Sequence, residues 1–213
     1  MTAYIRTAVC AGFWIFILTV PAFGLYTPNP AGRSPARSFS LMLDFEYNSK
    51  DLQHGPDLDM YGGFVRPTGS PIRNMSIYGR FGFRDADEVD TGFAGGAGFQ
   101  YAYEFPRAPE WAVGGAIDFL YWSADIQHDS HDIDWAEFQM TPAVSYAFRQ
   151  VPGLVPYVGA MFDFVEARSS IEQDDTVGML FGVTYDPDPQ VRLEVQGRLI
   201  SEDGVFVSAG YRF

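Results

Sequence analysis

The sequence predicts an all-β protein, a transmembrane up-and-down antiparallel β-barrel of about ten strands. Three observations lead to this prediction. Apolar residues alternate with small or polar residues along successive segments, which is the period of an extended chain. Large aromatic residues gather on the apolar faces, whereas the opposite faces carry glycine, alanine, serine, threonine and isolated charges. Connections between the segments alternate between two kinds, as an up-and-down barrel requires.

The chain begins with features of an export signal. Arg6 precedes an apolar run over residues 7–20, and small residues follow it up to Gly24. This pattern predicts a secretory signal peptide over 1–24, an N-terminal periplasmic segment over 25–37 and the barrel over 38–213. A membrane anchor is the alternative, but the run is shorter than the ~20 residues that a spanning helix needs. Cys10 is the single cysteine, so the processed chain offers no thiol or disulfide.

Nine segments alternate clearly, and a tenth does so weakly. The clear ones are 38–47, 73–84, 92–105, 111–123, 134–149, 157–164, 176–185, 190–200 and 204–213. The weak one, 58–66, contains two glycines. An up-and-down barrel with both termini on one side needs an even count, which favours ten strands. An eight-stranded barrel that begins near Ile72, with 25–71 as an extension, is the alternative.

The composition of the two faces favours a barrel in lipid over a soluble β-sandwich. The outer faces of a soluble sandwich are typically rich in lysine and glutamate, yet Lys50 is the single lysine here. Small residues with sparse charges suit a lumen, and large apolar residues with aromatics near the strand ends suit lipid and its interfaces. The chain ends "EDGVFVSAGYRF", whose alternation places Tyr211 and Phe213 on the lipid-facing side. We expect this last strand to pair with the first, so that no edge remains.

The connections define the two sides of the barrel. Short connections rich in proline and glycine fall at 66–71, 106–110, 150–153 and 186–189. Acidic connections fall at 48–59, 85–91, 124–134, 166–175 and 201–203, and these hold most of the 27 acidic residues. We expect the short turns and both termini on the periplasmic side and the acidic loops outside.

These features together resemble the outer-membrane β-barrels of Gram-negative bacteria, in the small OmpA-like, opacity-type or porin-like class. The signal peptide, the alternating strands, the turns and the final "YRF" carry the resemblance. It implies localisation in the bacterial outer membrane, contact with its lipid and lipopolysaccharide, and recognition of Tyr211 and Phe213 by the barrel-assembly machinery. The net charge of −13 excludes nucleic acid as a partner.

Charged residues on the inward faces predict a charge network across the lumen. Its members are Asp44, Glu46, Arg80, Glu104, Asp118, Glu137, Arg192, Glu194, Arg198 and Arg212. Buried charges are costly unless they are paired, so we expect these residues to pair with one another. Ten strands enclose a narrow lumen. We therefore expect a structural or surface-interaction protein, or a narrow porin-like pore, with a filled lumen favoured over an open channel.

Catalysis is not expected. Omptin-like proteases carry Asp-x-Asp and Asp-x-His pairs at the outer rim, and "DAD" at 85–87 and "DSH" at 129–131 have these letters. They lie on loops closer together than in that family, and the chain is shorter. Lipid A deacylase-like barrels have a His-x-Ser, matched by "HDS" at 128–130, but the rest of their motif is missing. These two enzyme classes are the alternatives.

A metal site is a weaker hypothesis, and we expect no cofactor. The candidate ligands are His128, Asp129, His131 and Asp132, whose spacing is looser than that of defined metal motifs. A solvated acidic loop is the simpler interpretation. Acidic loops beside anionic lipopolysaccharide are nonetheless expected to attract divalent cations such as Mg²⁺ or Ca²⁺.

Overall fold

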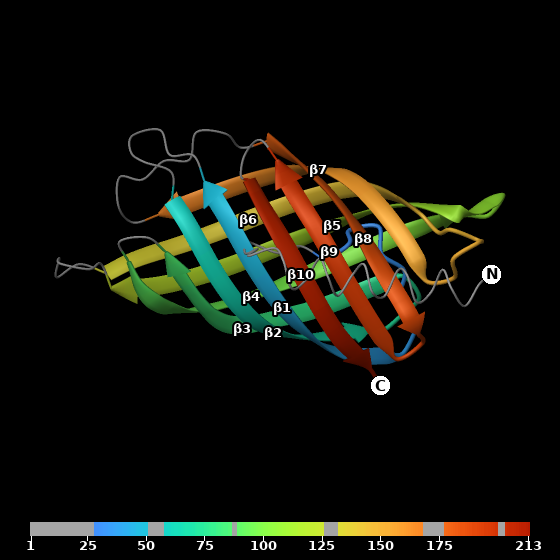
Figure 1. The fold of residues 1–213 in the computed structure, drawn as a ribbon, viewed down its shortest axis with the longest axis horizontal. Helices are drawn as coiled ribbons and strands as arrows, with labels where there is room; N and C mark the ends of the chain where they lie inside the picture. The colour runs from blue at the N-terminus through green and yellow to red at the C-terminus, as the bar shows by residue number, and fades with distance from the viewer. Residues whose placement is uncertain (1–27, 51–57, 87–88, 126–131, 168–176, 200–202) are drawn as a thin grey trace.

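The computed structural model of the chain describes residues 28–50, 58–86, 89–125, 132–167, 177–199 and 203–213. These residues form a ten-stranded antiparallel β-barrel (Figure 1). The strands are β1 (Ser38–Lys50), β2 (Leu58–Ser70), β3 (Met75–Ala86), β4 (Val89–Phe105), β5 (Ala108–Asp125), β6 (Asp132–Tyr146), β7 (Leu154–Ala167), β8 (Val177–Asp188), β9 (Val191–Leu199) and β10 (Asp203–Arg212). The ten-strand prediction is confirmed, and the eight-strand alternative is wrong because the weak segment is part of β2. None of the described residues forms a helix long and apolar enough to cross a membrane.

The barrel closes between its first and last strands. Strands β1 and β10 pair antiparallel from Ser40 opposite Arg212 to Ser49 opposite Asp203. The register continues to the last residue, because the Phe213 N–H donates to the Phe39 carbonyl at 2.8 Å. Phe213 therefore extends the pairing of the β1–β10 seam by one hydrogen bond, and closure between these strands leaves no unpaired edge among the described strands.

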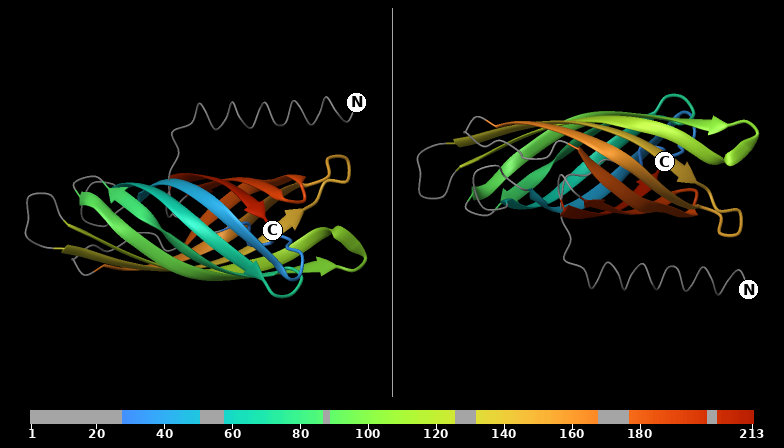
Figure 2. Two further views of the ribbon diagram at one scale, coloured as in Figure 1. Left: turned by 90° about the horizontal axis from the view of Figure 1, so that it is seen from below. Right: turned by 90° about the horizontal axis from the view of Figure 1, so that it is seen from above.

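The two ends of the barrel differ. At one end, here called the turn end, lie the connections 71–74, 106–107, 147–153 and 189–190 together with Ser38 and the C-terminus. The opposite end, here called the loop end, is where Lys50, Ala86, Asp125, Ala167 and Leu199 end their strands. Strands β4 and β5 have 17 and 18 residues, whereas β9 and β10 have 9 and 10. The β4–β5 hairpin consequently projects beyond its neighbours at the turn end (Figure 2).

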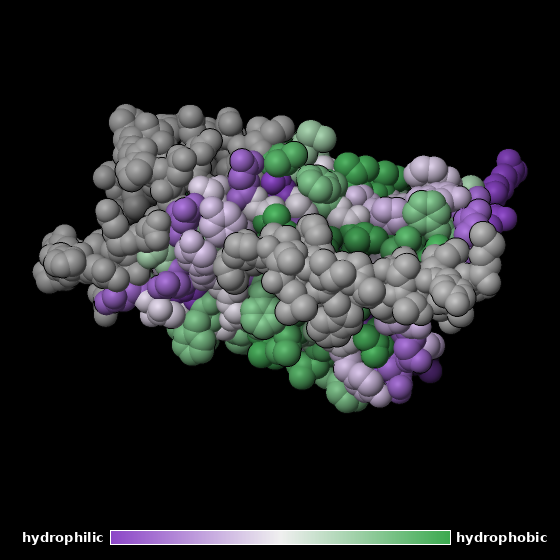
Figure 3. Space-filling model, in the orientation of Figure 1, coloured by the Kyte–Doolittle hydropathy of each residue, from purple (hydrophilic) through white to green (hydrophobic). Residues whose placement is uncertain are grey.

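The outer surface is apolar around its middle. Outward side chains such as Leu43, Phe81 and Val158 are about half exposed, and a hydrophobic belt lies between more hydrophilic ends on the visible face (Figure 3). Aromatic pairs lie near both ends of the strands, with Tyr47 and Tyr61 toward the loop end and Trp111 and Tyr146 toward the turn end. Their rings are 5.5 and 4.8 Å apart, respectively. Two aromatic girdles around an apolar belt are what a barrel presents to lipid and its interfaces.

One predicted turn lies elsewhere. The sequence segment 66–71 was expected to be a connection, but β2 continues to Ser70 and the turn occupies 71–74. Pro67 is accommodated because β2 pairs with β1 there, while the β2–β3 register skips positions 66 and 67. A proline has no N–H to give to a ladder, so one side of the strand stays unpaired at that point. As a result Arg66 belongs to the barrel wall and faces the lumen.

Candidate functional site

The lumen at the turn end is occupied by the chain's own N-terminal segment. Residues 28–36, here called the plug segment, precede β1 and run from inside the barrel to the exposed Pro35 and Ala36 at its mouth (Figure 1). Pro28 to Gly32 are all buried, and Ala31 is fully so. The sequence had been interpreted as a periplasmic segment over 25–37, and the described part of it lies in the mouth of the lumen.

The sequence "NPAG" at 29–32 gives the plug segment its compact shape. The Gly32 N–H donates to the Asn29 carbonyl at 2.8 Å, which closes a four-residue turn. Asparagine first, proline second and glycine last is the preferred order for a type I turn. The Ala31 N–H also donates to the Asn29 side-chain oxygen at 3.1 Å, a local bond typical of asparagine in turns. The chain can therefore fold back within the narrow mouth.

Strands from most of the circumference hold the plug segment. Its hydrogen bonds to the wall involve Glu194 of β9 (2.7 Å), Thr184 of β8 (3.1 Å), Ser145 of β6 (2.9 Å), Gln100 of β4 (3.1 Å) and the Glu110 carbonyl of β5 (2.7 Å). The β5 wall approaches so closely that a Cβ on Gly114 would lie 2.5 Å from the Pro30 carbonyl oxygen. These contacts fix the segment across the mouth.

Deeper in the lumen, an aspartate and an arginine form a bidentate pair. Arg66 donates to Asp44 through Nε at 2.7 Å and through Nη2 at 3.1 Å, and both residues are almost fully buried. Ser208 donates to the same carboxylate at 2.5 Å. The guanidinium lies 5.6 Å from the ring centroid of Tyr78, whose hydroxyl donates to Asp118 at 2.6 Å. Bidentate geometry and extra donors are what a buried ion pair needs to offset its desolvation.

A second group of charges centres on Glu46. Its carboxylate accepts from Arg80 at 2.7 Å and from Arg84 at 2.9 Å, and all three side chains are almost fully buried. Arg84 also lies 3.8 Å from Glu137. Arg80 stacks 4.7 Å from the ring of Phe64. The Glu46 carboxylate of β1 thus joins two arginines of β3, and β6 contributes the second acid, Glu137.

The third group lies on the side of β9. Arg198 donates to Gln139 at 3.0 Å and covers the Phe206 ring at 4.5 Å. The Tyr157 hydroxyl lies 2.8 Å from Glu194 and 2.9 Å from Gln196. Glu194 also accepts the Asn29 N–H, so this group connects the plug segment to the interior of the barrel.

Toward the loop end the lumen becomes apolar. A cluster of buried residues comprises Met60, Phe64, Ala86, Ala94, Leu120, Trp122, Ala124 and Trp135. The two indole rings lie 6.5 Å apart and are both fully buried. The described part of the lumen thus contains the plug segment and, beyond it, the charged groups and this apolar cluster. The last two interleave, because Arg80 lies 4.7 Å from the Phe64 ring and Arg84 lies 6.0 Å from the Trp122 ring. Large side chains filling a narrow barrel make a packed core.

The predicted charge network divides into two sets by position. Asp44, Glu46, Arg80, Asp118, Glu137, Glu194 and Arg198 are buried in the lumen, whereas Glu104, Arg192 and Arg212 lie partly exposed in the mouth at the turn end. Sequence reasoning missed Arg66, Arg84 and Asp163, which are also buried there. Arg84 and Asp163 could have been found from the sequence, because the alternation of side chains along β3 and β7 places both on the inward face. Arg66 was missed because Pro67 suggested a turn.

Other predicted residues lie mainly outside the described part of the chain. His128, Asp129 and His131 are outside it, and of Asp132 only the position at the start of β6 is given. Among the described residues no group of three or more histidine, cysteine or acidic side chains could hold a metal ion. Asp85 accepts a hydrogen bond from Thr91 at 3.0 Å. The metal and protease motifs therefore stay predictions.

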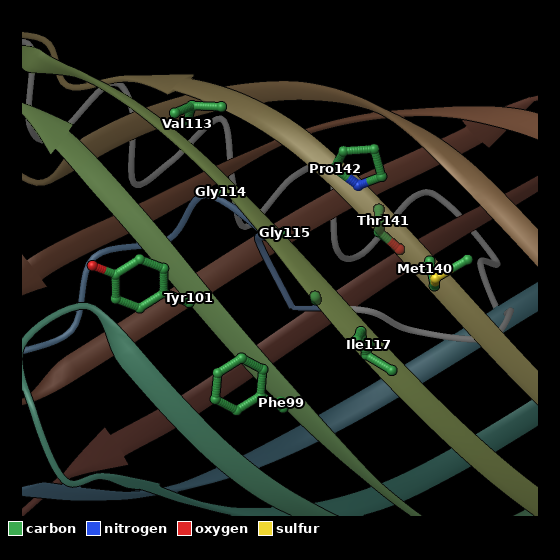
Figure 4. Close-up of a pocket in the computed structure, with 10 residues that line it drawn as sticks. Phe99, Tyr101, Val113, Gly114, Gly115, Ile117, Met140, Thr141 and Pro142 are labelled. Atoms are coloured by element: carbon green, nitrogen blue, oxygen red, sulfur yellow. The ribbon is translucent and has the colours of Figure 1, made fainter.

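The outer wall also carries an apolar hollow of about 440 Å³ over β4, β5 and β6 (Figure 4). It forms at Gly115, whose missing side chain leaves space between Tyr101 and Pro142 in the same cross-strand row. Pro142 interrupts the β6–β7 register at positions 141 and 142. The hollow faces the hydrocarbon region and has no charged residue in its lining.

Comparison with solved structures places this architecture among known proteins. The barrel is similar to an outer-membrane channel from Pseudomonas putida F1, with a TM-score of 0.50, 9% identity and coverage of 88% of this chain and 99% of that one. It is also similar to the β-domain of the Bordetella autotransporter BrkA, with a TM-score of 0.53, 11% identity and coverage of 83% and 99%. The chain has the fold of an outer-membrane β-barrel.

This outer-membrane β-barrel fold agrees with the apolar belt and the aromatic girdles, and it confirms the predicted resemblance and localisation. No protein-family model matches the chain, and no curated protein matches it either. At identities near one in ten the likeness extends to the fold alone. The side chains that fill the lumen are therefore the features of this chain that bear on its function.

Proposed function

We propose that the protein is a closed outer-membrane barrel with a structural or surface-interaction role, and that it does not act as a wide diffusion channel. The plug segment supports this proposal most directly, because five wall strands hold it across the turn end. The charged groups and the tryptophan cluster behind it fill the lumen further with packed side chains. Solutes would have to displace the plug segment and these side chains to pass.

Two measurements test the closed state. Purified barrel refolded into planar bilayers should give little or no conductance, and liposomes that contain it should not swell in isotonic sugar solutions. The same preparation must show a folded β-sheet circular dichroism spectrum, so that failure to insert is not mistaken for closure. Large stable conductance steps or sugar-dependent swelling would overturn the proposal.

A narrow gated pore is the second candidate, and the chemistry of the plug segment favours it. The contacts that hold the segment are mainly hydrogen bonds, which contribute about 0.5–1.5 kcal/mol net between neutral groups because water competes for the same groups. The bonds to the Glu194 carboxylate and from the Arg33 guanidinium involve a charged group and contribute about 1.5–3 kcal/mol. Release of the segment would open the turn end while the wall stays intact. Conduction would then also require rearrangement of the side chains deeper in the lumen.

A pair of cysteines separates the two candidates. The Ser34 and Ser76 hydroxyl oxygens lie 3.2 Å apart, so Ser34→Cys with Ser76→Cys places two sulfurs near bonding distance and ties the plug segment to β3. The Ser70 and Ser76 oxygens lie 3.1 Å apart, so the pair Ser70→Cys with Ser76→Cys changes the same Ser76 but joins two wall strands and leaves the plug segment outside the cross-link. A gated pore loses conductance on oxidation in the first pair and keeps it in the second. A closed barrel shows no redox-dependent conductance in either.

The expected partners follow from the membrane position. We propose contact with lipopolysaccharide at the loop end, divalent cations bridging its phosphates to the acidic loops, and recognition of Tyr211 and Phe213 by the barrel-assembly machinery. Both aromatic side chains are exposed on the outer surface beside the β1–β10 seam. Catalysis is not part of the proposal. Incubation with a dibasic peptide and with lipopolysaccharide should give no cleavage product, and cleavage of either would overturn this point.

A further inference from the structure

A cavity of about 540 Å³ opens between the plug segment and the barrel wall at the turn end. The plug segment contributes residues 33–36 to its lining, and the wall contributes side chains from the β2–β3 turn, β4, β8 and β10. The lining residues include Arg33, Arg73, Glu104, Asp186 and Arg212. The cavity lies on the side where the turns and the C-terminus are, away from the buried charge groups.

Arginines outnumber acids around this cavity. Glu104 lies between Arg33 at 3.7 Å and Arg73 at 2.6 Å. Asp186 is likewise shared, by Arg192 at 2.9 Å and Arg212 at 3.4 Å. Arg192 pairs with Asp186 from outside the cavity, and the lining itself holds three arginines and two acids, an excess of one positive charge. The Arg33 and Arg212 side chains are 25% and 17% exposed, so water screens their charges less than on an open surface, whereas Arg73 is 72% exposed.

We propose that this cavity is a binding site for an oxyanion, with the phosphate group as the chemical class. The negative charge of a phosphate group complements the excess of arginine in the lining, and its oxygens accept the paired N–H donors of guanidinium groups. The Ser34 and Asn74 side chains line the same cavity and supply further polar groups. Because Arg33 lies on the plug segment and Arg212 on β10, a bound phosphate joins the plug segment to the wall.

The site and the plug are thermodynamically linked. An anion that binds only when Arg33 is in place stabilises the plugged state by the factor 1 + [L]/Kd. At ten times the Kd this factor is about 11, so the released state becomes about elevenfold rarer. The inference rests on the proposed closed function, because the cavity exists only while the plug segment occupies the mouth.

The test is isothermal titration calorimetry, in which inorganic phosphate is added to the folded, detergent-solubilised protein at constant ionic strength. We expect saturable binding with a Kd of about 1 mM or tighter. R212Q on the wall and R33Q on the plug segment should each weaken it by about tenfold or more, since each removes charge-assisted hydrogen bonds. R149Q is the matched control, because Arg149 is an exposed arginine at the same end but outside the cavity.

Two further arms identify the source of the phosphate and separate this site from the plug. In nanodiscs, phosphatidylglycerol should compete with free phosphate if a lipid headgroup fills the cavity, and should not compete if the ligand is soluble. Cross-linking of Ser34→Cys with Ser76→Cys reports the plug segment independently. Efficient cross-linking without saturable phosphate binding, or equal binding by R212Q and R149Q, would overturn the anion site while leaving the closed barrel intact.

Discussion

Replacement of Glu46 by glutamine tests whether the lumen is a dry, packed interior. The side chain is 1% exposed and accepts from both Arg80 and Arg84. Glu46→Gln keeps the size of the side chain but removes the charge that Arg80 and Arg84 share, while Glu137 lies 3.8 Å from Arg84. Removing one partner of a buried ion pair costs about 3–5 kcal/mol, because the remaining charge stays desolvated. We expect a loss of this size in the free energy of unfolding.

The assay is equilibrium urea unfolding in lipid vesicles, followed by tryptophan fluorescence. The indoles of Trp122 and Trp135 are fully buried in the lumen and report its exposure to water. The double variant Glu46→Gln with Arg84→Met should recover part of the loss, because it removes a charge along with its partner. The exposed arginine Arg149 pairs with Glu110, and Arg149→Gln should leave the unfolding midpoint almost unchanged. Equal effects of Glu46→Gln and Arg149→Gln would refute the packed lumen.

Three further predictions concern the plug segment, the apolar cluster and assembly. Gly114→Val should reduce oxidative cross-linking between Ser34→Cys and Ser76→Cys, because its Cβ would lie 2.5 Å from the Pro30 carbonyl oxygen. Gly115→Val is the control and should leave this cross-linking unchanged, because its Cβ has no neighbour nearer than 3.6 Å. Trp122→Ala should lower the free energy of unfolding by about 3–5 kcal/mol in the same urea assay, as for other buried aromatic residues. Deletion of Phe213, which is 71% exposed, should lower the amount of folded barrel in cell membranes far more than it changes the urea midpoint of refolded protein. Unchanged cross-linking in Gly114→Val, a Trp122→Ala loss below about 1 kcal/mol, or normal membrane levels without Phe213 would each contradict the corresponding argument.

Much of the architecture followed from local alternation. A residue's parity along an extended chain decides which face it occupies, so the inward position of Glu46 and the outward position of Phe81 could be predicted from their neighbours alone. The failures came where a local signal competed with this pattern. Pro67 suggested a turn, whereas β2 tolerates it on the side where the β3 ladder is interrupted, and Arg66 was lost from the predicted network for that reason.

The plug segment illustrates a different limit. The "NPAG" turn at 29–32 is encoded locally, but nothing in those four letters states that the turn lies inside the barrel. Its place depends on partners far along the chain: Asn29 meets Glu194 across 165 positions, and Ala31 meets Ser145 across 114. Only a closed wall with its strands in register brings such groups to the same mouth.

The sequence by itself therefore determined the class of this protein and the faces of its strands, because both depend on a period of two and on the solvent that each face meets. It favoured ten strands over eight, and the closed sheet decided between the two numbers. The tertiary structure alone decided which charges pair, that the N-terminal segment fills the mouth, and that four arginines surround two acids beside it. The curvature and stagger of a closed sheet choose those neighbours, and this geometry is a property of ten strands together.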